Sequence, residues 1–198
     1  LAVAMKALTQ YHEATGDKRV IPLLMKYVRY LKTHPPDWPD REWRGVRAME
    51  NLVSLFWLYN RTGDPEILEV AESIYKNCLD WTGYFLHFPY TDETMKKGIR
   101  YGHPSHVVNI AMATKYPGLI YLLTHEDRYK RAVYEGLQSL DRYHGQVAGR
   151  FSGDEHLSGR RPTQGTELCG VVEFMFSLEN LTAIFGDPLF ADRLELLA

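Results

Sequence analysis

One turn pattern recurs four times along the chain and limits the folds that it can adopt. Each turn joins two segments of helical periodicity, and an acidic residue stands in all four, at Asp17, Asp64, Asp127 and Asp187. Three of the turns carry a Gly-Asp pair, and Glu126-Asp127 takes the corresponding place in the third turn along the chain. Glycine often ends a helix here because it adopts a left-handed backbone without steric cost. The repeat, spaced by about 47 to 63 residues, predicts an array of helical hairpins.

The segments around these turns predict helices, because their apolar residues recur at the i, i+3, i+4, i+7 spacing of one helix face. Longer helices are expected over residues 44–61, 106–124 and 171–185, the second with an interruption near Lys115. No useful length of chain alternates with the period of two that a strand requires. The predicted fold class is therefore all-α, a partial (α/α)₆ toroid of helical hairpins, with an open superhelix as the other arrangement of such hairpins.

Composition narrows the class of protein. With 198 residues, 45% of them hydrophobic and 24% charged, the chain can bury one sizeable core. A formal net charge of -2 without a long Lys/Arg run argues against a nucleic-acid partner. No apolar run is expected to reach the roughly 18 residues of a membrane span. The two cysteines are too few for a disulfide framework, and Cys78, on an apolar helical stripe, is predicted to lie in the core.

Residues able to do chemistry concentrate in a Gly-rich loop that begins at Gly149 and leads into the last long apolar helix. Asp154, Glu155 and His156 follow one another in this loop, and a carboxylate here can act as a general acid or base. The alternative is an ordinary solvated loop carboxylate. The helix that follows is apolar almost all round, so it is expected to be a buried central element.

Glu167 and Cys169 stand where the loop joins this helix. Carboxylate and thiolate both bind zinc, but positions i and i+2 of a helix point about 200° apart, whereas in an extended segment they point the same way. A shared metal therefore requires the helix to start at or after Cys169, and we expect the start between Glu167 and Gly170. The alternative is a first-turn glutamate that interacts with the helix dipole and a small core cysteine.

A second long loop is expected between Gly83 and Ser105, and loops of this length in compact domains tend to be functional. It leads into the sequence Gly-His-Pro-Ser-His, which contains His103 and His106. Either histidine can orient a sugar hydroxyl. A capping or loop histidine is the alternative interpretation.

The loop and the helix behind it resemble the β-L-arabinofuranosidase family of glycoside hydrolases. Gly153-Asp-Glu155, Gly165-Thr-Glu167-Leu-Cys169, an apolar helix and a Phe-Gly-Asp turn are similar to that family's Gly-Glu and Glu-Thr-Cys segments. The helix that starts His106-Val-Val-Asn-Ile-Ala resembles its Gly-His helix. The resemblance covers most of the chain in helical pattern, although few residues are specific to it.

The resemblance implies an (α/α)₆ toroid with an added β domain and a retaining glycosidase whose nucleophile is a zinc-bound cysteine. It makes Glu155 the acid/base, His106 and His103 substrate-binding residues, and Glu167 and Cys169 zinc ligands. The family's downstream cysteine pair is not in this sequence, so the zinc site is expected to be incomplete here. Residues 1–198 are then a fragment of a single (α/α) barrel catalytic domain, with both ends expected to be cut.

The expected partner is a carbohydrate, an L-arabinofuranoside or a related plant-type glycan, without nucleic acid and without a membrane span. A secreted or periplasmic location suits a glycan-degrading enzyme, although the sequence leaves location open. Two other interpretations remain. One is a non-catalytic helical-repeat scaffold, and the other is a different (α/α)₆ sugar enzyme, such as an epimerase or an unsaturated glucuronyl hydrolase, which would need no Glu-x-Cys pair.

Overall fold

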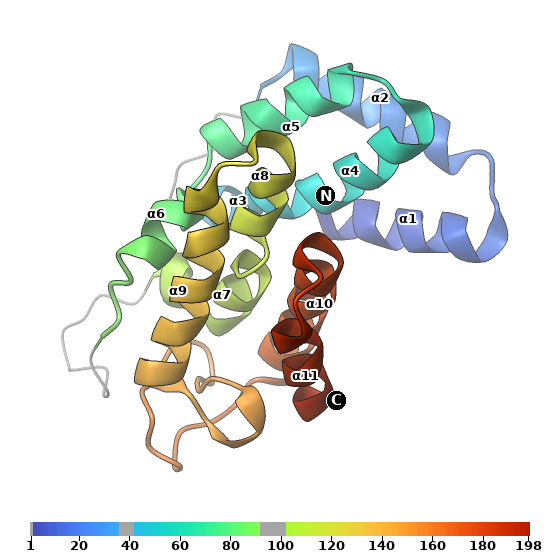
Figure 1. Ribbon diagram of the computed structural model, residues 1–198. Helices are drawn as coiled ribbons and strands as arrows, with labels where there is room; N and C mark the ends of the chain where they lie inside the picture. The colour runs from blue at the N-terminus through green and yellow to red at the C-terminus, as the bar shows by residue number, and fades with distance from the viewer. Residues whose placement is uncertain (1, 36–41, 92–101) are drawn as a thin grey trace. The chain divides into compact units, whose positions relative to one another are not determined.

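The computed structural model describes residues 2–35, 42–91 and 102–198, and over these ranges the ordered elements are helical (Figure 1). The α-helices are α1 (Ala2–Thr15), α2 (Val20–Thr33), α3 (Trp43–Arg47), α4 (Asn51–Thr62), α5 (Glu66–Lys76), α6 (Trp81–Leu86), α7 (Val107–Ala113), α8 (Tyr116–Thr124), α9 (Asp127–His144), α10 (Leu168–Phe185) and α11 (Pro188–Leu197). Short 3₁₀ helices are η1 (Ala48–Glu50), η2 (His103–Ser105) and η3 (Val147–Gly149). Within the described ranges, extended pairing is limited to three isolated bridges. The predicted all-α class is confirmed.

The chain divides into two compact units, residues 1–79 and 80–198. The first holds two hairpins, α1–α2 and α4–α5, with α1 packed against α4 and α2 against α5. Fully buried aliphatic side chains such as Val28, Leu55 and Ile67 fill this core. The Glu50 carboxylate, also fully buried, pairs with Lys6 Nζ at 3.1 Å. These contacts stack the two hairpins side by side, as the repeat predicts.

The predicted turns share one backbone conformation. Gly16, Gly63 and Gly186 end their helices in the left-handed region, with φ of 67°, 65° and 63°. In the third turn, His125 takes this conformation with φ of 55°, and Glu126 follows it. The expected position of Asp127 in that turn is therefore wrong by one residue, since Asp127 is already the first residue of α9.

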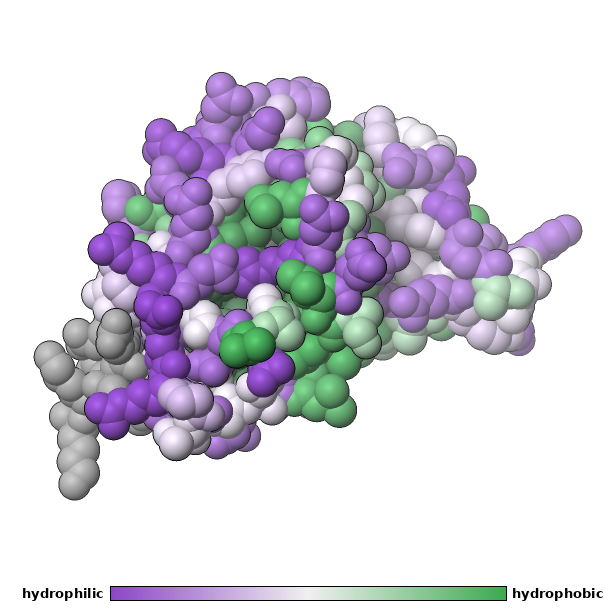
Figure 2. Space-filling view, turned by 60° about the horizontal axis from the view of Figure 1, so that its bottom comes forward, coloured by the Kyte–Doolittle hydropathy of each residue, from purple (hydrophilic) through white to green (hydrophobic). Residues whose placement is uncertain are grey.

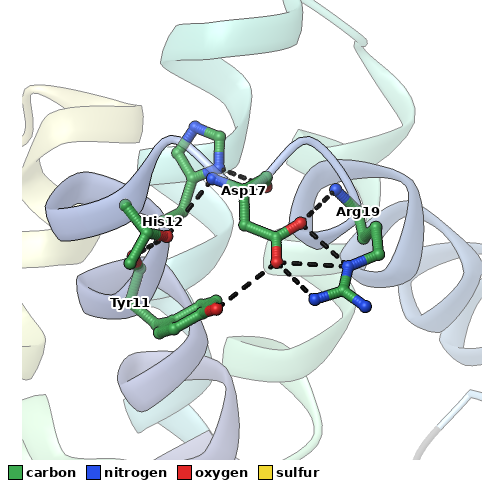
Figure 3. Close-up of polar contacts among 5 residues, drawn as sticks. Tyr11, His12, Asp17 and Arg19 are labelled. Carbon is green, nitrogen blue, oxygen red and sulfur yellow. Dashed lines mark hydrogen bonds and ion pairs between the residues drawn. The ribbon is translucent and has the colours of Figure 1, made fainter.

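The acidic residue of each Gly-Asp turn starts the next helix. Figure 3 shows the first turn, where the Asp17 carboxylate accepts from the Arg19 backbone N–H at 2.9 Å and from the Arg19 guanidinium. This guanidinium holds the pKa of Asp17 well below its usual value. Asp64 accepts from Glu66 N at 3.0 Å in the same way, as does Asp187 from Leu189 N at 3.0 Å. Side-chain acceptors at this position satisfy N–H groups that the new helix leaves unpaired.

The second unit packs α10 against α7 and α11, and α9 against α6 and α8. Glycines permit two close approaches. A Cβ on Gly136 of α9 would lie 2.6 Å from the Phe85 ring of α6, and a Cβ on Gly118 of α8 would lie 2.8 Å from Leu181 of α10. The break between α7 and α8 falls at Thr114-Lys115, as predicted, and the fully buried Lys115 donates to Met112 O at 3.0 Å.

Two expected helices differ from the structure. The single helix expected over 44–61 is divided into α3, η1 and α4. Here the Asn51 side chain donates to Ala48 O at 2.7 Å, a local hydrogen bond of the kind that competes with the regular helical pattern. The other difference concerns α10, which is only partly buried. Leu168 and Val172 on this helix are 73% and 54% exposed.

The partial exposure of α10 also bears on the expectation about membrane spans. By length and composition α10 could cross a membrane, with a mean hydropathy of 1.5, so the expectation that no apolar run is long enough is wrong. Its packing against α7 and α11, and Glu173 and Glu179 within it, are features of a helix in a helical bundle. Apolar surface is visible among hydrophilic residues in Figure 2.

Candidate active site

The Gly-rich loop after α9 is fastened to the N-terminal end of α7 by backbone hydrogen bonds. Val107 N donates to Glu155 O at 2.9 Å, and Leu157 N donates to Ser105 O at 3.0 Å. The pairing forms an isolated antiparallel bridge between His106 and His156. Segments about 50 positions apart in the sequence are thereby held together through their backbones. Of the long loop expected over 83–105, residues 92–101 lie outside the described residues.

Gly153 connects the same loop to the start of α10. Its N–H donates to Gly165 O at 2.9 Å, and its carbonyl accepts from Glu167 N at 3.0 Å. The φ of Gly153 is 152°, and a Cβ at this position would lie 2.3 Å from Val107 Cγ1 and 2.4 Å from His156 O. Only glycine fits this conformation and this space. The Gly-rich composition therefore serves close backbone approach, as the sequence indicates.

These connections bring three predicted site residues together. One ligand atom each from His106, Glu155 and Glu167 lies within 4.8 Å of the others. His106 Nε2 lies 3.0 Å from Glu155 Oε2, with the His106 side chain 10% exposed and that of Glu155 71% exposed. The cluster thus combines a buried imidazole with a carboxylate that solvent or a ligand can reach.

The backbone fixes the protonation pattern of His106. Its Nδ1 accepts a hydrogen bond from Val108 N at 3.2 Å and so caps the first turn of α7. A backbone N–H can only donate, so Nδ1 carries a lone pair and Nε2 carries the proton of the neutral ring. The protonated Nε2 therefore lies 3.0 Å from the Glu155 carboxylate. This arrangement agrees with the alternative of a capping histidine and places Nε2–H beside the predicted acid/base, whereas metal binding through Nε2 would require the proton to leave.

Glu167 contributes a buried oxygen that lacks a hydrogen-bond donor. Glu167 Oε2 has no such partner among the described residues, and the buried Arg150 Nε likewise has no hydrogen-bond acceptor there. Both residues line a cavity of about 10 Å³, together with Val107, Phe151, Gly153, Gly170, Val171 and Phe174. A cavity of this size holds about one water molecule.

Cys169 is placed differently from the other predicted metal ligand. Helix α10 begins at Leu168, inside the predicted interval, and Glu167 precedes it with extended backbone. Cys169 is already the second helical residue and is exposed, and it is outside the group of three formed by His106, Glu155 and Glu167. A metal shared by Glu167 and Cys169 was expected to require a helix start at or after Cys169. The helix starts one residue earlier, so this requirement is not met. Cys78 is buried, as predicted.

His156 and His103 surround the cluster on the loop side. His156 Nδ1 lies 2.8 Å from the Ser105 hydroxyl, which itself donates to Gly102 O at 2.9 Å. Burial, with help from the neighbouring His106, lowers the pKa of His156. The His103 carbonyl accepts from Asn109 Nδ2 at 2.8 Å, which joins η2 to α7.

Asp154, the other candidate acid, lies beside Gly165. A Cβ on Gly165 would overlap the Asp154 carboxylate, with 1.6 Å to Oδ1, so this side chain covers that glycine. Glu155, by contrast, reaches His106. Of the two adjacent carboxylates, Glu155 is the one that joins the cluster.

Sequence reasoning gave no role to Ser105 or Arg150. Ser105 is visible in the sequence only as part of Gly-His-Pro-Ser-His, and Arg150 only as one charge of a polar loop. Ser105 contacts His156 beside an isolated bridge, and Arg150 lines the same cavity as Glu167. Contacts of this kind leave no periodic pattern in the sequence.

Comparison with known proteins identifies the family of the chain. The family model described as beta-L-arabinofuranosidase, GH127 catalytic domain, matches residues 1–198. Among curated proteins, none matches significantly.

Two solved structures match the chain, and the first of them is similar in fold. The Lin0763 protein from Listeria innocua is 13% identical with a TM-score of 0.63, over 99% of this chain and 56% of that protein's chain. A family 76 glycoside hydrolase from a bovine Bacteroides thetaiotaomicron strain is 15% identical with a TM-score of 0.45, over 75% of this chain and 33% of its own. The chain thus spans about half the length of the Listeria protein.

The family match covers every residue of the chain, including the loop and helix that build the cluster. Residues 1–198 therefore belong to the β-L-arabinofuranosidase family, within its GH127 catalytic domain.

Proposed function

We propose that the protein containing this chain is a retaining glycoside hydrolase that acts on L-arabinofuranosides or a related plant-type glycan. The observation that carries the proposal is the close approach of His106 Nε2 to the exposed Glu155 carboxylate, at 3.0 Å, in a chain of this family. An exposed carboxylate held in place by a buried donor meets the geometric need of a general acid/base, which must reach the glycosidic oxygen in a defined orientation.

In this proposal Glu155 protonates the leaving oxygen in its acid form and later accepts a proton from the attacking water. His106 orients Glu155 because its own ring is fixed by the Val108 N–H. One Glu155 oxygen is held by His106, and the other is left to face the substrate. His103 is proposed to contact a sugar hydroxyl, whereas the two ring nitrogens of His106 already face Val108 N–H and Glu155.

Glu167 and Cys169 are proposed to hold a zinc ion, which requires the first turn of α10 to unwind by one residue, because the helix already begins at Leu168. The buried Glu167 Oε2, without a hydrogen-bond donor in the described part of the chain, fits a cation, and Cys169 is exposed near the same helix start. A bound zinc ion would keep a coordinating thiol in its thiolate form. Because structural and catalytic zinc sites use three or four protein ligands, these two would need further ligands from elsewhere in the protein.

A second mechanism is favoured by one distance. Oxygens of Glu155 and Glu167 lie within 4.8 Å of one another, close to the roughly 5–5.5 Å between carboxyl groups in retaining glycosidases that use a carboxylate nucleophile. In this version Glu167 attacks the sugar and no metal takes part. Glu167→Gln distinguishes the two, because it weakens zinc binding in the first mechanism, whereas in the second it abolishes turnover without changing the metal content.

The test is hydrolysis of a panel of aryl glycosides by the full-length protein, with β-L-arabinofuranoside among α-L-arabinofuranoside, glucoside and glucuronide controls. Proton NMR of the first product gives its anomeric configuration. The proposal expects release of L-arabinose with retention. Inversion would contradict the retaining mechanism. A complete lack of hydrolysis across the panel would favour the helical-repeat scaffold, and turnover of unsaturated glucuronides alone would favour the other class of (α/α)₆ enzyme.

A further inference from the structure

A buried histidine outside the cluster fastens both ends of the loop segment that carries Glu155. His144 is the last residue of α9 and is fully buried. Its carbonyl accepts from Ser152 N at 2.9 Å, at the start of the segment. Its ring Nδ1 accepts from Gly159 N at 2.9 Å, at the end of the segment. One residue thus closes the loop on either side of Glu155.

The ring of His144 has a third connection. Its Nε2 lies 2.8 Å from Tyr90 O, in the segment that follows α6. The Phe88 ring meets the imidazole edge to face, with centroids 6.0 Å apart. His144 therefore joins α9, the segment after α6 and the Glu155 loop at one buried point.

These partners fix the tautomer of the ring. Gly159 N–H can only donate, so Nδ1 must be the acceptor, and Tyr90 O can only accept, so Nε2 must carry the proton. Burial lowers the pKa of His144 below its ordinary value, in agreement with a neutral ring. Hydrogen bonds that leave a buried polar ring with both nitrogens satisfied hold it in one orientation.

The two ends of the segment are also joined to each other. The Ser152 hydroxyl donates to Gly159 O, and the Ser158 hydroxyl donates to Ser152 Oγ at 3.2 Å. Between these ends, Glu155 O is held by Val107 N. The Glu155 backbone is consequently held near its middle by the pairing of Glu155 and Leu157 with the start of α7, near Gly153 by the start of α10, and at the two ends by His144.

We propose that His144 is a positioning residue that holds the loop 152–159 in the shape that presents Glu155 to substrate, and that its Gly159 hydrogen bond does this. The inference rests on the proposed role of Glu155 as acid/base. Misplacing a catalytic group by about 1 Å can cost about 100-fold in rate, so a loosened loop end is expected to lower turnover rather than substrate affinity.

Two substitutions separate the two ring bonds in the full-length protein. His144→Asn places an amide oxygen near the Nδ1 position and keeps an acceptor for Gly159 N–H while it loses the Tyr90 bond. His144→Gln places an amide N–H near the Nε2 position and keeps the donor to Tyr90 O while it loses the acceptor for Gly159. Both remove the aromatic ring, so they are matched in lost packing against Phe88.

We expect His144→Gln to lower kcat by about 10- to 100-fold with KM within about threefold, and His144→Asn to stay within about threefold of wild type. Hydrogen–deuterium exchange of the peptide that contains Gly159 should be faster in His144→Gln than in His144→Asn. A merely structural role would lower thermal stability in both variants and leave kcat per folded molecule equal between them.

Equal kcat values for the two folded variants, or faster Gly159 exchange in His144→Asn, would overturn the inference. The exchange measurement needs no substrate. If the wild-type protein hydrolyses no glycoside, the proposed function fails, while the exchange order still decides whether His144 anchors the loop through Gly159.

Discussion

Hydrogen bonds from the backbone decide what the side chains of the candidate site can do. Val108 N–H donates to His106 Nδ1, so Nε2 carries the proton of the neutral ring, and this nitrogen lies 3.0 Å from a Glu155 carboxylate oxygen. The same logic fixes the ring of His144. In both cases a single amide selects one tautomer, so the chemistry of each histidine depends on its place in the fold.

Substitution of His106 tests this dual role. His106→Asn keeps a side-chain acceptor for the first turn of α7 and loses the bond to Glu155, so we expect unfolding free energy within about 0.5 kcal/mol of wild type. Turnover should nevertheless fall about tenfold, because Glu155 loses its orienting donor. His106→Ala should lose turnover and also about 1 kcal/mol of unfolding free energy, because the cap of α7 is removed. Urea denaturation combined with steady-state kinetics checks both effects, and an unchanged kcat in His106→Asn would contradict the orienting role.

His144 also predicts a pH dependence of stability. Its pKa is lowered in the folded protein from an ordinary value of 6.5 by burial, so the unfolded state binds more protons between the two values. The free energy of unfolding therefore rises with pH through this window. The contribution is fully present above pH 6.5 and is lost as pH falls through it.

Thermal denaturation of wild type and His144→Asn between pH 5 and pH 8 measures this contribution. The wild-type protein should lose more stability on acidification than the variant does, because the variant has no ring to protonate. His156, whose pKa is also lowered, acts in the same direction in both proteins and serves as a common background. Parallel curves for the two proteins would contradict the assignment to His144.

At the scale of elements, the four hairpin turns share one feature, a residue with left-handed backbone. Gly16, Gly63 and Gly186 and the third-turn His125 adopt nearly the same φ, although their sequence contexts differ. The turn signal was readable from the sequence because glycine and aspartate are required there for separate physical reasons, left-handed backbone and N–H capping. The third turn was misplaced by one residue because histidine carries no such signal.

Gly63→Ala tests the cost of this conformation. Gly63 has φ of 65°, and an added Cβ would have no neighbour within 4 Å, so the effect is one of backbone alone. We expect a loss of about 1–2 kcal/mol in unfolding free energy. Gly63→Asn is the control, since asparagine tolerates the left-handed region, and it should lose less. A loss in Gly63→Ala no larger than that in Gly63→Asn, measured by urea denaturation, would argue against strain at this turn.

For helix α10, the sequence pattern predicts where the helix starts but not how much of it is buried. Its start at Leu168 was predictable from the Gly-Thr-Glu lead-in, and its apolar composition suggested full burial. The structure leaves Leu168 and Val172 exposed, because composition does not tell which neighbours cover a helix. In the same way, the meeting of His106, Glu155 and Glu167 depends on isolated bridges, which have no periodic signature, although each residue could be named from the sequence.

At the scale of the whole molecule, every residue of the candidate site lies in the second unit, residues 80–198. The chain spans 56% of the similar Listeria protein, so metal content and turnover are properties to measure on the full-length protein. There, Cys169→Ala should lower both the zinc-to-protein ratio and the turnover, while Glu155→Gln should keep its zinc. Atomic emission on both variants checks this, and full zinc and activity in Cys169→Ala would remove the metal proposal.

The central claim is that Glu155 is the acid. The most direct test is how the loss of activity in Glu155→Gln depends on the leaving group of the substrate. The dinitrophenolate of a dinitrophenyl arabinofuranoside leaves without protonation, whereas the sugar leaving group of an arabinose disaccharide must be protonated by an acid. The measurement is the ratio of kcat/KM between wild type and Glu155→Gln on each substrate in the full-length protein. The account predicts a loss of about 100- to 10,000-fold on the disaccharide and a much smaller loss on the dinitrophenyl glycoside. An equal loss on both would contradict an acid role for Glu155, and unchanged activity on both would move that role to another carboxylate, first of all Asp154.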